Sequence, residues 1–150
     1  MAVWVPENIT ASITTPNFFK EFCIPFYHEV AEILHKEDKI LVAHMDGLLK
    51  PLIELIAESD VDVIEAFTPS PMGDISISEA RKMWKNKIIW MNYPGIIIAN
   101  NDLNFIREYT KDILKSIAPG DRFLIGCTEN FPLENWEKSF SEILKVLEEK

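Results

Sequence analysis

The sequence predicts an α/β protein in which helices cover a parallel β-sheet. Two observations lead to this prediction. Short apolar segments typical of buried strands alternate with longer segments that repeat apolar residues at helical spacing. Most of the side chains able to do chemistry also follow these apolar segments directly. In parallel sheets, ligands bind beyond the carboxyl ends of the strands.

The first half of the chain begins with a short strand and a polar loop. Thr15 and Pro16 then have the character of a helix N-cap and a first-turn proline. We expect Pro25 to kink the helix that follows, because proline lacks the backbone N–H that a regular helix uses. The elements expected here are strands over residues 2–5, 39–44 and 61–66, a helix running from residue 16 to about residue 34, and a helix over roughly 48–58.

The second half continues the alternation. Ser76 and Glu79 have the spacing of a capping box, which predicts a helix from there to about Lys85. The remaining expected elements are strands over residues 87–91 and 122–126, a helix from about residue 102 to 117, and a C-terminal helix with apolar residues from 136 to 147 on one face. Since no linker or low-complexity tract interrupts the pattern, we expect a single domain over residues 1–150.

Composition excludes several classes of function. The formal charge is −9, from 24 acidic and 15 basic residues, and the lysines are scattered. This argues against nucleic acid or an anionic membrane as a partner. Cys23 and Cys127 are too few for a disulfide framework, and the first residues do not resemble a secretion signal. We therefore expect a cytoplasmic protein whose partner is a small molecule.

Short strands joined by helices predict right-handed crossovers and a parallel sheet. The carboxyl ends of such strands lie at one edge, so the residues there are the candidates for a binding site. They are Glu7 after the first strand, His44 and Asp46 after the second, residues 65–74 after the third, Asn92 after the fourth, and Cys127, Glu129 and Asn130 after the fifth.

Residues 44–47, with the sequence HMDG, combine a strand end, two metal-competent side chains and a glycine turn. Side chains two apart on a strand point to the same face, so His44 and Asp46 are expected to project together. One interpretation makes them catalytic residues. In the other, His44 is a hydrogen-bonded histidine at a strand end and Asp46 caps the next helix.

Several motifs occur in an order that resembles a known superfamily. They are PEN at residues 6–8, HMDG at 44–47, SDVDVIEA at 59–66, IIWMNYP at 88–94 and LIGCTENFPLENW at 124–136. The chain resembles the C-terminal portion of the uroporphyrinogen decarboxylase superfamily, which includes zinc-dependent methyltransferases that act on methylated corrinoid proteins. The resemblance implies a TIM (β/α)8 barrel, of which this chain supplies about five βα units. Such a barrel takes about 250 residues, so we expect a fragment or truncated member of the family. The alternative is that a homodimer or a partner carrying the N-terminal half-barrel completes the sheet.

Two chemistries follow from the resemblance. For the methyltransferases it implies a zinc ion that activates a thiol, with His44, Asp46 and Cys127 as ligands and Glu7 as a further candidate. Here Asp46 stands where the family has a cysteine. A His, carboxylate and thiolate set is acceptable to zinc.

For the decarboxylases the resemblance implies a polycarboxylate tetrapyrrole substrate and no metal. Cys127 then stands at the position where the decarboxylases have a histidine. The arginines that could bind the substrate carboxylates are only Arg81, Arg107 and Arg122. The expected function is therefore a superfamily domain that contributes to a small-molecule site and is inactive alone. The expected substrate contacts are Glu7, Asn92, Glu129 and Asn130, with helix capping as an alternative role for the last two. A non-catalytic half-barrel that binds a ligand is the other interpretation.

Overall fold

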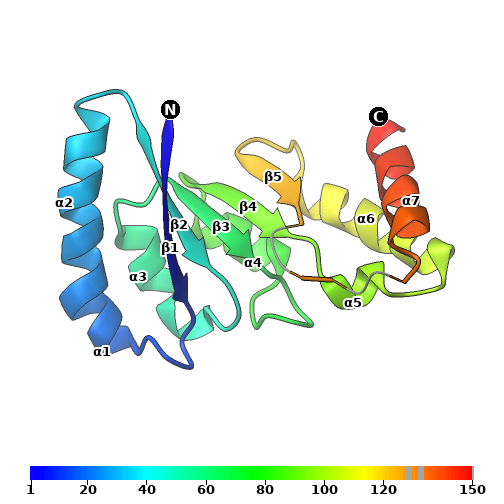
Figure 1. Cartoon of the computed structure of the whole chain (residues 1–150), viewed down its shortest axis with the longest axis horizontal. Helices are drawn as coiled ribbons and strands as arrows, with labels where there is room; N and C mark the ends of the chain where they lie inside the picture. Colours follow the sequence, from blue (N-terminus) through cyan, green and yellow to red (C-terminus); the bar gives the residue numbers. More distant parts are fainter. Residues whose placement is uncertain (128–129, 132–133, 150) are drawn as a thin grey trace.

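The computed structural model describes residues 1–127, 130–131 and 134–149. Its center is a five-stranded sheet in which neighbouring strands run parallel, in the order β1-β2-β3-β4-β5 (Figure 1). The strands are β1 (Ala2–Ile9), β2 (Ile40–Met45), β3 (Val63–Phe67), β4 (Ile88–Asn92) and β5 (Phe123–Gly126). The prediction of an α/β fold with a parallel sheet is confirmed. β1 and β5 form the two edges of this sheet.

Helical segments connect successive strands, and Figure 1 shows α2 at one end of the molecule and α6 and α7 at the other. The helical segments are α1 (Pro16–Phe18), η1 (Phe19–Cys23), α2 (Ile24–His35), η2 (Lys50–Leu52), α3 (Ile53–Glu58), α4 (Ile77–Met83), α5 (Gly95–Ile98), α6 (Leu103–Ile117) and α7 (Trp136–Glu148). None of the helices in the described ranges is long and apolar enough to cross a membrane.

Local sequence signals account for several element boundaries. The Oγ atoms of Thr15 and Ser76 accept hydrogen bonds from backbone N–H groups three residues ahead, as N-caps do. The interruption expected at Pro25 takes the form of the π-helical segment η1, after which Pro25 occupies the first turn of α2, where a missing N–H is tolerated. The sequence did not predict the short helix α5, which lies between β4 and α6.

The two faces of the sheet differ in burial. Leu41, Ala43 and Met45 of β2 are fully buried and belong to the hydrophobic core. Side chains alternate along a strand, so the neighbours of these residues point to the opposite face. On that face Trp4 is 55% exposed and Leu124 is 49% exposed. We call it the open face of the sheet.

Candidate functional site

Candidate side chains from different strands meet at one edge of the sheet. His44 is the next-to-last residue of β2 and Asp46 follows that strand, while Asn92 ends β4 and Cys127 follows β5. Because the strands are parallel, these positions share the carboxyl edge, which we call the rim. Glu7 approaches the same edge from β1.

Two strand irregularities shape the rim. The pairing of β1 with β2 shifts between Val5 and Ile9, where Asn8 has a φ of 56°. The pairing of β3 with β4 shifts between Glu65 and Phe67, where Ala66 has a φ of 64°. Left-handed backbone is uncommon for residues other than glycine, and bulges of this kind re-aim neighbouring side chains near functional sites. Both irregularities adjoin a rim carboxylate, Glu7 or Glu65.

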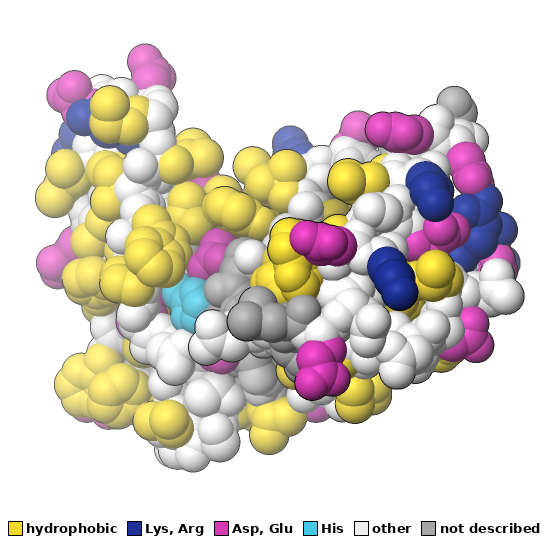
Figure 2. All heavy atoms as spheres, turned by 45° about the vertical axis from the view of Figure 1, so that its right-hand side comes forward, with side chains coloured by type: hydrophobic (Ala, Val, Ile, Leu, Met, Phe, Trp, Pro, Cys, Tyr) yellow, Lys and Arg dark blue, Asp and Glu magenta, His cyan; other side chains and the backbone are white. Residues whose placement is uncertain are grey.

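The most specific contact of the rim joins His44 to Glu65. The Nδ1 atom of His44 lies 2.6 Å from Oε2 of Glu65, and the side chains are only 13% and 7% exposed. The indole N–H of Trp4 donates to the same Oε2 at 3.1 Å, and its ring packs edge-on against His44. Figure 2 shows a histidine between hydrophobic and acidic side chains in the hollowed middle of the surface.

This contact fixes the orientation of the imidazole. An ionised carboxylate can only accept hydrogen bonds, so the proton at the contact belongs to Nδ1 of His44. The other ring nitrogen, Nε2, therefore points away from Glu65. His44 is thus a candidate proton-transfer group whose ring is held in one orientation by Glu65.

Glu7 forms a second cluster, between β1 and α2. Its Oε1 accepts a hydrogen bond from the hydroxyl of Tyr27. Its Oε2 is buried and has no hydrogen-bond partner among the described residues. Burial raises the pKa of Glu7 above its ordinary value, although the bond from Tyr27 opposes the rise. Burial, followed by the charge of Glu7, also raises the pKa of Cys23.

The raised pKa of Glu7 predicts a pH-dependent stability difference. A carboxyl that binds its proton more tightly when folded favours folding while protonated, and this advantage is lost as the pH rises through the folded pKa. Relative to Glu7→Gln, the wild type should therefore lose thermal stability between acidic and neutral pH. Melting temperatures of both proteins across this range test the prediction, and a constant difference would contradict it.

Asp46 does not cap the next helix, which corrects one of the two interpretations of the HMDG motif. The backbone N–H groups of Leu49 and Lys50 donate instead to Oδ1 of Asp74. The Oδ1 atom of Asp46 is buried without a hydrogen-bond partner in the described ranges. Gly47, which directly follows Asp46, has a φ of 69°. A side chain at this position would come too close to Oγ1 of Thr10.

The expected zinc ligands do not assemble into a metal site. Among the described residues, no three His, Cys, Asp or Glu side chains are arranged so that they could hold a metal ion. His44, Asp46 and Cys127 all lie within the described residues, so this result covers the expected set. The described donor set therefore does not fit zinc, and elemental analysis is the test of the expected zinc site.

The remaining expected contacts have different surroundings. Asn92 is buried, and its side-chain N–H donates to Oγ1 of Thr68 at 3.1 Å. Asn130 is exposed, and its backbone lies close to Gly95. It does not cap α7, whose N-cap is Asn135. Glu129 lies outside the described residues.

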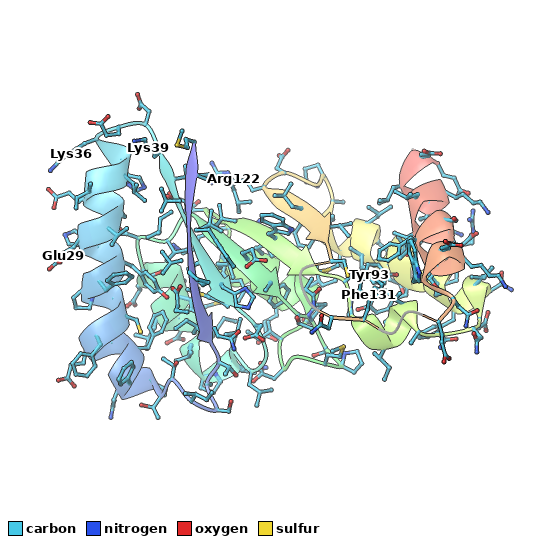
Figure 3. The ribbon with its side chains drawn as sticks, in the orientation of Figure 1. Glu29, Lys36, Lys39, Tyr93, Arg122 and Phe131 are labelled. Atoms are coloured by element: carbon cyan, nitrogen blue, oxygen red, sulfur yellow. The ribbon has the colours of Figure 1, made fainter. Side chains whose placement is uncertain are left out.

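All three arginines bond to groups away from the rim. Arg81 donates to backbone carbonyls of Trp84, Lys87 and Arg122, and Arg107 pairs with Glu142 and Glu149. Arg122 donates to the carbonyl of Asn86. Figure 3 shows Arg122 where the strands begin, whereas Tyr93 lies beyond the end of β4. The carboxylates of the rim are therefore not paired with any of the three arginine side chains.

Sequence reasoning included Glu65 only as the first residue of the candidate range 65–74, and it gave Trp4 and Tyr27 no role in the site. A signal for Glu65 was present, because a lone carboxylate inside the apolar strand VDVIEA is rarely buried unless it is paired. No comparable signal exists for Trp4 and Tyr27, since the contacts that they make join segments far apart in the sequence.

Comparisons with known proteins agree with this geometry. The sequence profile of the family described as uroporphyrinogen decarboxylase (URO-D) matches residues 2–137. A methyltransferase from Methanosarcina mazei has a similar structure, with a TM-score of 0.66 and 13% sequence identity. The match covers 97% of this chain and 42% of that one, as expected for the C-terminal part of a (β/α)8 barrel. No curated protein matches the chain significantly.

Proposed function

This chain belongs to the uroporphyrinogen decarboxylase family, and on that basis we propose that it forms part of a small-molecule site at the carboxyl ends of the strands, with His44 as the proton-transfer group. The observation that carries the proposal is the 2.6 Å contact between Nδ1 of His44 and Oε2 of Glu65. A histidine oriented by a buried carboxylate is a recurrent general acid–base arrangement.

The chemistry assigned to His44 is a single proton transfer at Nε2. In a decarboxylation, the bond between a carbon atom and its carboxylate breaks, CO2 leaves and the carbon takes up a proton. Protonated His44 supplies that proton, and the contact with Glu65 holds the ring in the orientation for the transfer. In the opposite direction, neutral His44 removes a proton from the substrate.

The charge of the described rim does not by itself favour a substrate with several carboxylates. Glu7, Asp46 and Glu65 are all at least half-buried there, whereas the arginines bond elsewhere. A substrate with many carboxylates would bring further anions into this environment, and buried unpaired charges cost several kcal/mol each. Such a substrate would need cationic groups from other strands.

We further propose that an N-terminal half-barrel completes the site. The chain spans about two fifths of the similar methyltransferase, and β1 and β5 are edges of the described sheet. In the helical segments that follow β1, Phe18 and Phe22 are each about half exposed and pack against each other with ring centroids 4.9 Å apart. Unpaired strand edges and apolar patches are typical association surfaces.

Methyl transfer to a thiol is the second candidate, because the similar solved structure is named a methyltransferase and Cys127 follows a rim strand. In the family this chemistry implies zinc, which the described donor set does not fit. We therefore derive no step through a metal.

Zinc content separates the two candidates. The geometry predicts that protein purified without chelator holds far less than one zinc ion per chain, and that Cys127→Ser leaves this content unchanged. Elemental analysis of the two proteins provides the measurement. About one zinc per wild-type chain, lost in the variant, would contradict the metal-free site and favour methyl transfer.

Activity of the completed barrel tests the proposed function. With a matching N-terminal half added, decarboxylation of uroporphyrinogen and methyl transfer from methylcobalamin to a thiol are assayed side by side. His44→Asn is expected to lower whichever rate is found by about 10²- to 10⁴-fold, the usual contribution of a general acid or base. Glu54→Gln, on the exposed surface of α3, is the control and should retain the rate. An unchanged rate in His44→Asn would refute the assignment.

A further inference from the structure

We propose that Asp74 is a positioning residue for the rim, and that it holds the strand end that carries His44 and Asp46 in its working place. Asp74 acts through the backbone, because its carboxylate binds the main chain just after β2. We call residues 46–49 the rim turn. The inference rests on the proposed function, since it names a residue that supports the His44 site.

The rim turn keeps a buried carboxylate in an unfavourable position. It is fixed at its two ends, because Met45 and Leu49 are both buried in the hydrophobic core. Between them, the Oδ1 atom of Asp46 is buried and has no hydrogen-bond partner in the described part of the chain. Burying a polar atom in this way costs free energy. The conformation therefore persists only where neighbouring contacts hold it.

Asp74 supplies such contacts from the loop between β3 and α4. Its Oδ1 accepts hydrogen bonds from the backbone N–H groups of Leu49 at 2.8 Å and Lys50 at 3.1 Å. Bonds accepted by an ionised carboxylate are stronger than those between neutral groups. The loop is itself anchored, because Ile75 is buried and its carbonyl accepts a hydrogen bond from the N–H of Ser70.

The same loop lies directly against the rim turn. A methyl side chain at Gly73 would come within 1.9 Å of the carbonyl oxygen of Thr68 and 3.1 Å of that of Gly47. Real side chains do not approach backbone atoms so closely, so the packing of loop against turn requires glycine at position 73. A larger residue there would push the loop away from the turn.

The loop after β1 holds the rim turn from the other side with neutral contacts. Oγ1 of Thr10 accepts from the N–H of Leu48 at 3.2 Å, and the N–H of Ala11 donates to the carbonyl of Leu48 at 2.7 Å. Loss of the Asp74 carboxylate would leave the turn held on this side only. Asp46 could then turn toward water, and the end of β2 with His44 could shift.

The accessibility of Asp46 in the full chain provides the test. Carboxylates are coupled to glycine ethyl ester with a carbodiimide, and the extent of labelling at Asp46 is read by mass spectrometry. Asp74→Ala should raise this labelling several-fold, whereas Asp74→Asn keeps an acceptor oxygen and should remain close to the wild type. Gly73→Ala retains Asp74 but displaces the loop, so it should raise the labelling too. Glu79→Gln removes only the exposed ion pair with Lys50 and is the matched control.

Kinetics of the completed barrel distinguish positioning from a merely structural role. Asp74→Ala is expected to lower kcat by about 10- to 100-fold with little change in KM, because it misplaces reacting groups without removing a contact to the substrate. Asp74→Asn should restore most of the rate. Circular dichroism confirms that each variant is folded. If Asp74→Ala does not fold, Asp74→Ser replaces it, because serine retains a neutral acceptor with a shorter reach.

Three results would overturn the inference. They are unchanged labelling of Asp46 in Asp74→Ala and Gly73→Ala, equal labelling in Asp74→Ala and Glu79→Gln, and a rise in KM at constant kcat in Asp74→Ala. Failure of the proposed function would appear differently, as an unchanged rate in His44→Asn. The labelling of Asp46 does not depend on that rate, so the two failures are distinguishable.

Discussion

The purified chain alone is expected to release no coproporphyrinogen from uroporphyrinogen. The substrate carries many carboxylates, and these must be neutralised as they enter a water-poor pocket. The rim instead presents Glu7, Asp46 and Glu65, while the arginines bond to groups elsewhere. Product formation over time by the wild-type chain, compared with an enzyme-free sample, provides the measurement.

A matching N-terminal half-barrel supplied in trans should change this result only if it brings cationic groups to the rim. Activity should then appear in the mixture and in neither half alone. A full-length decarboxylase of the family serves as the positive control. Coproporphyrinogen production by the isolated chain above the enzyme-free rate would show that the chemistry or completeness of its site is misjudged.

Replacing Glu65 is expected to have the largest effect on the described site. Glu65→Ala removes the acceptor shared by Nδ1 of His44 and the indole N–H of Trp4. Hydrogen bonds to charged groups contribute about 1.5–3 kcal/mol each, and half-exposed Trp4 regains contact with water. The free energy of unfolding should therefore fall by about 2 kcal/mol, as measured by urea denaturation.

Glu65→Gln is the matched control for this prediction, because glutamine keeps the shape and one carbonyl oxygen while it removes the charge. It should destabilise the protein less than Glu65→Ala does, yet it should still reduce proton transfer by His44 in the completed barrel. Equal stability of Glu65→Ala and the wild type would mean that the contacts to Glu65 contribute nothing to folding.

The elements could be predicted because their signals are local. Thr15 and Ser76 cap helices as their positions suggest, and all five apolar segments form strands in one parallel sheet. The strand-end rule also identified His44 as a rim residue. These inferences need only periodicity, capping chemistry and the shared direction of the strands.

The partners of the rim residues could not be predicted from the sequence. The bulges near Asn8 and Ala66 alter the strand register, and no local pattern announces them. The cap expected from Asp46 is supplied by Asp74, which is adjacent only in the folded chain. The pairing of His44 with Glu65 likewise depends on strand register, which the sequence alone does not reveal.

The tautomer of His44 tests the central claim most directly. In long-range ¹H–¹⁵N correlation spectra recorded at mildly alkaline pH, neutral His44 is expected to carry its proton on Nδ1, where Oε2 of Glu65 accepts it. Glu65→Gln should weaken this preference, and the signals are assigned by their loss in His44→Asn. A wild-type His44 protonated on Nε2, with Nδ1 bare, would contradict the claim that Glu65 orients a proton-transfer histidine.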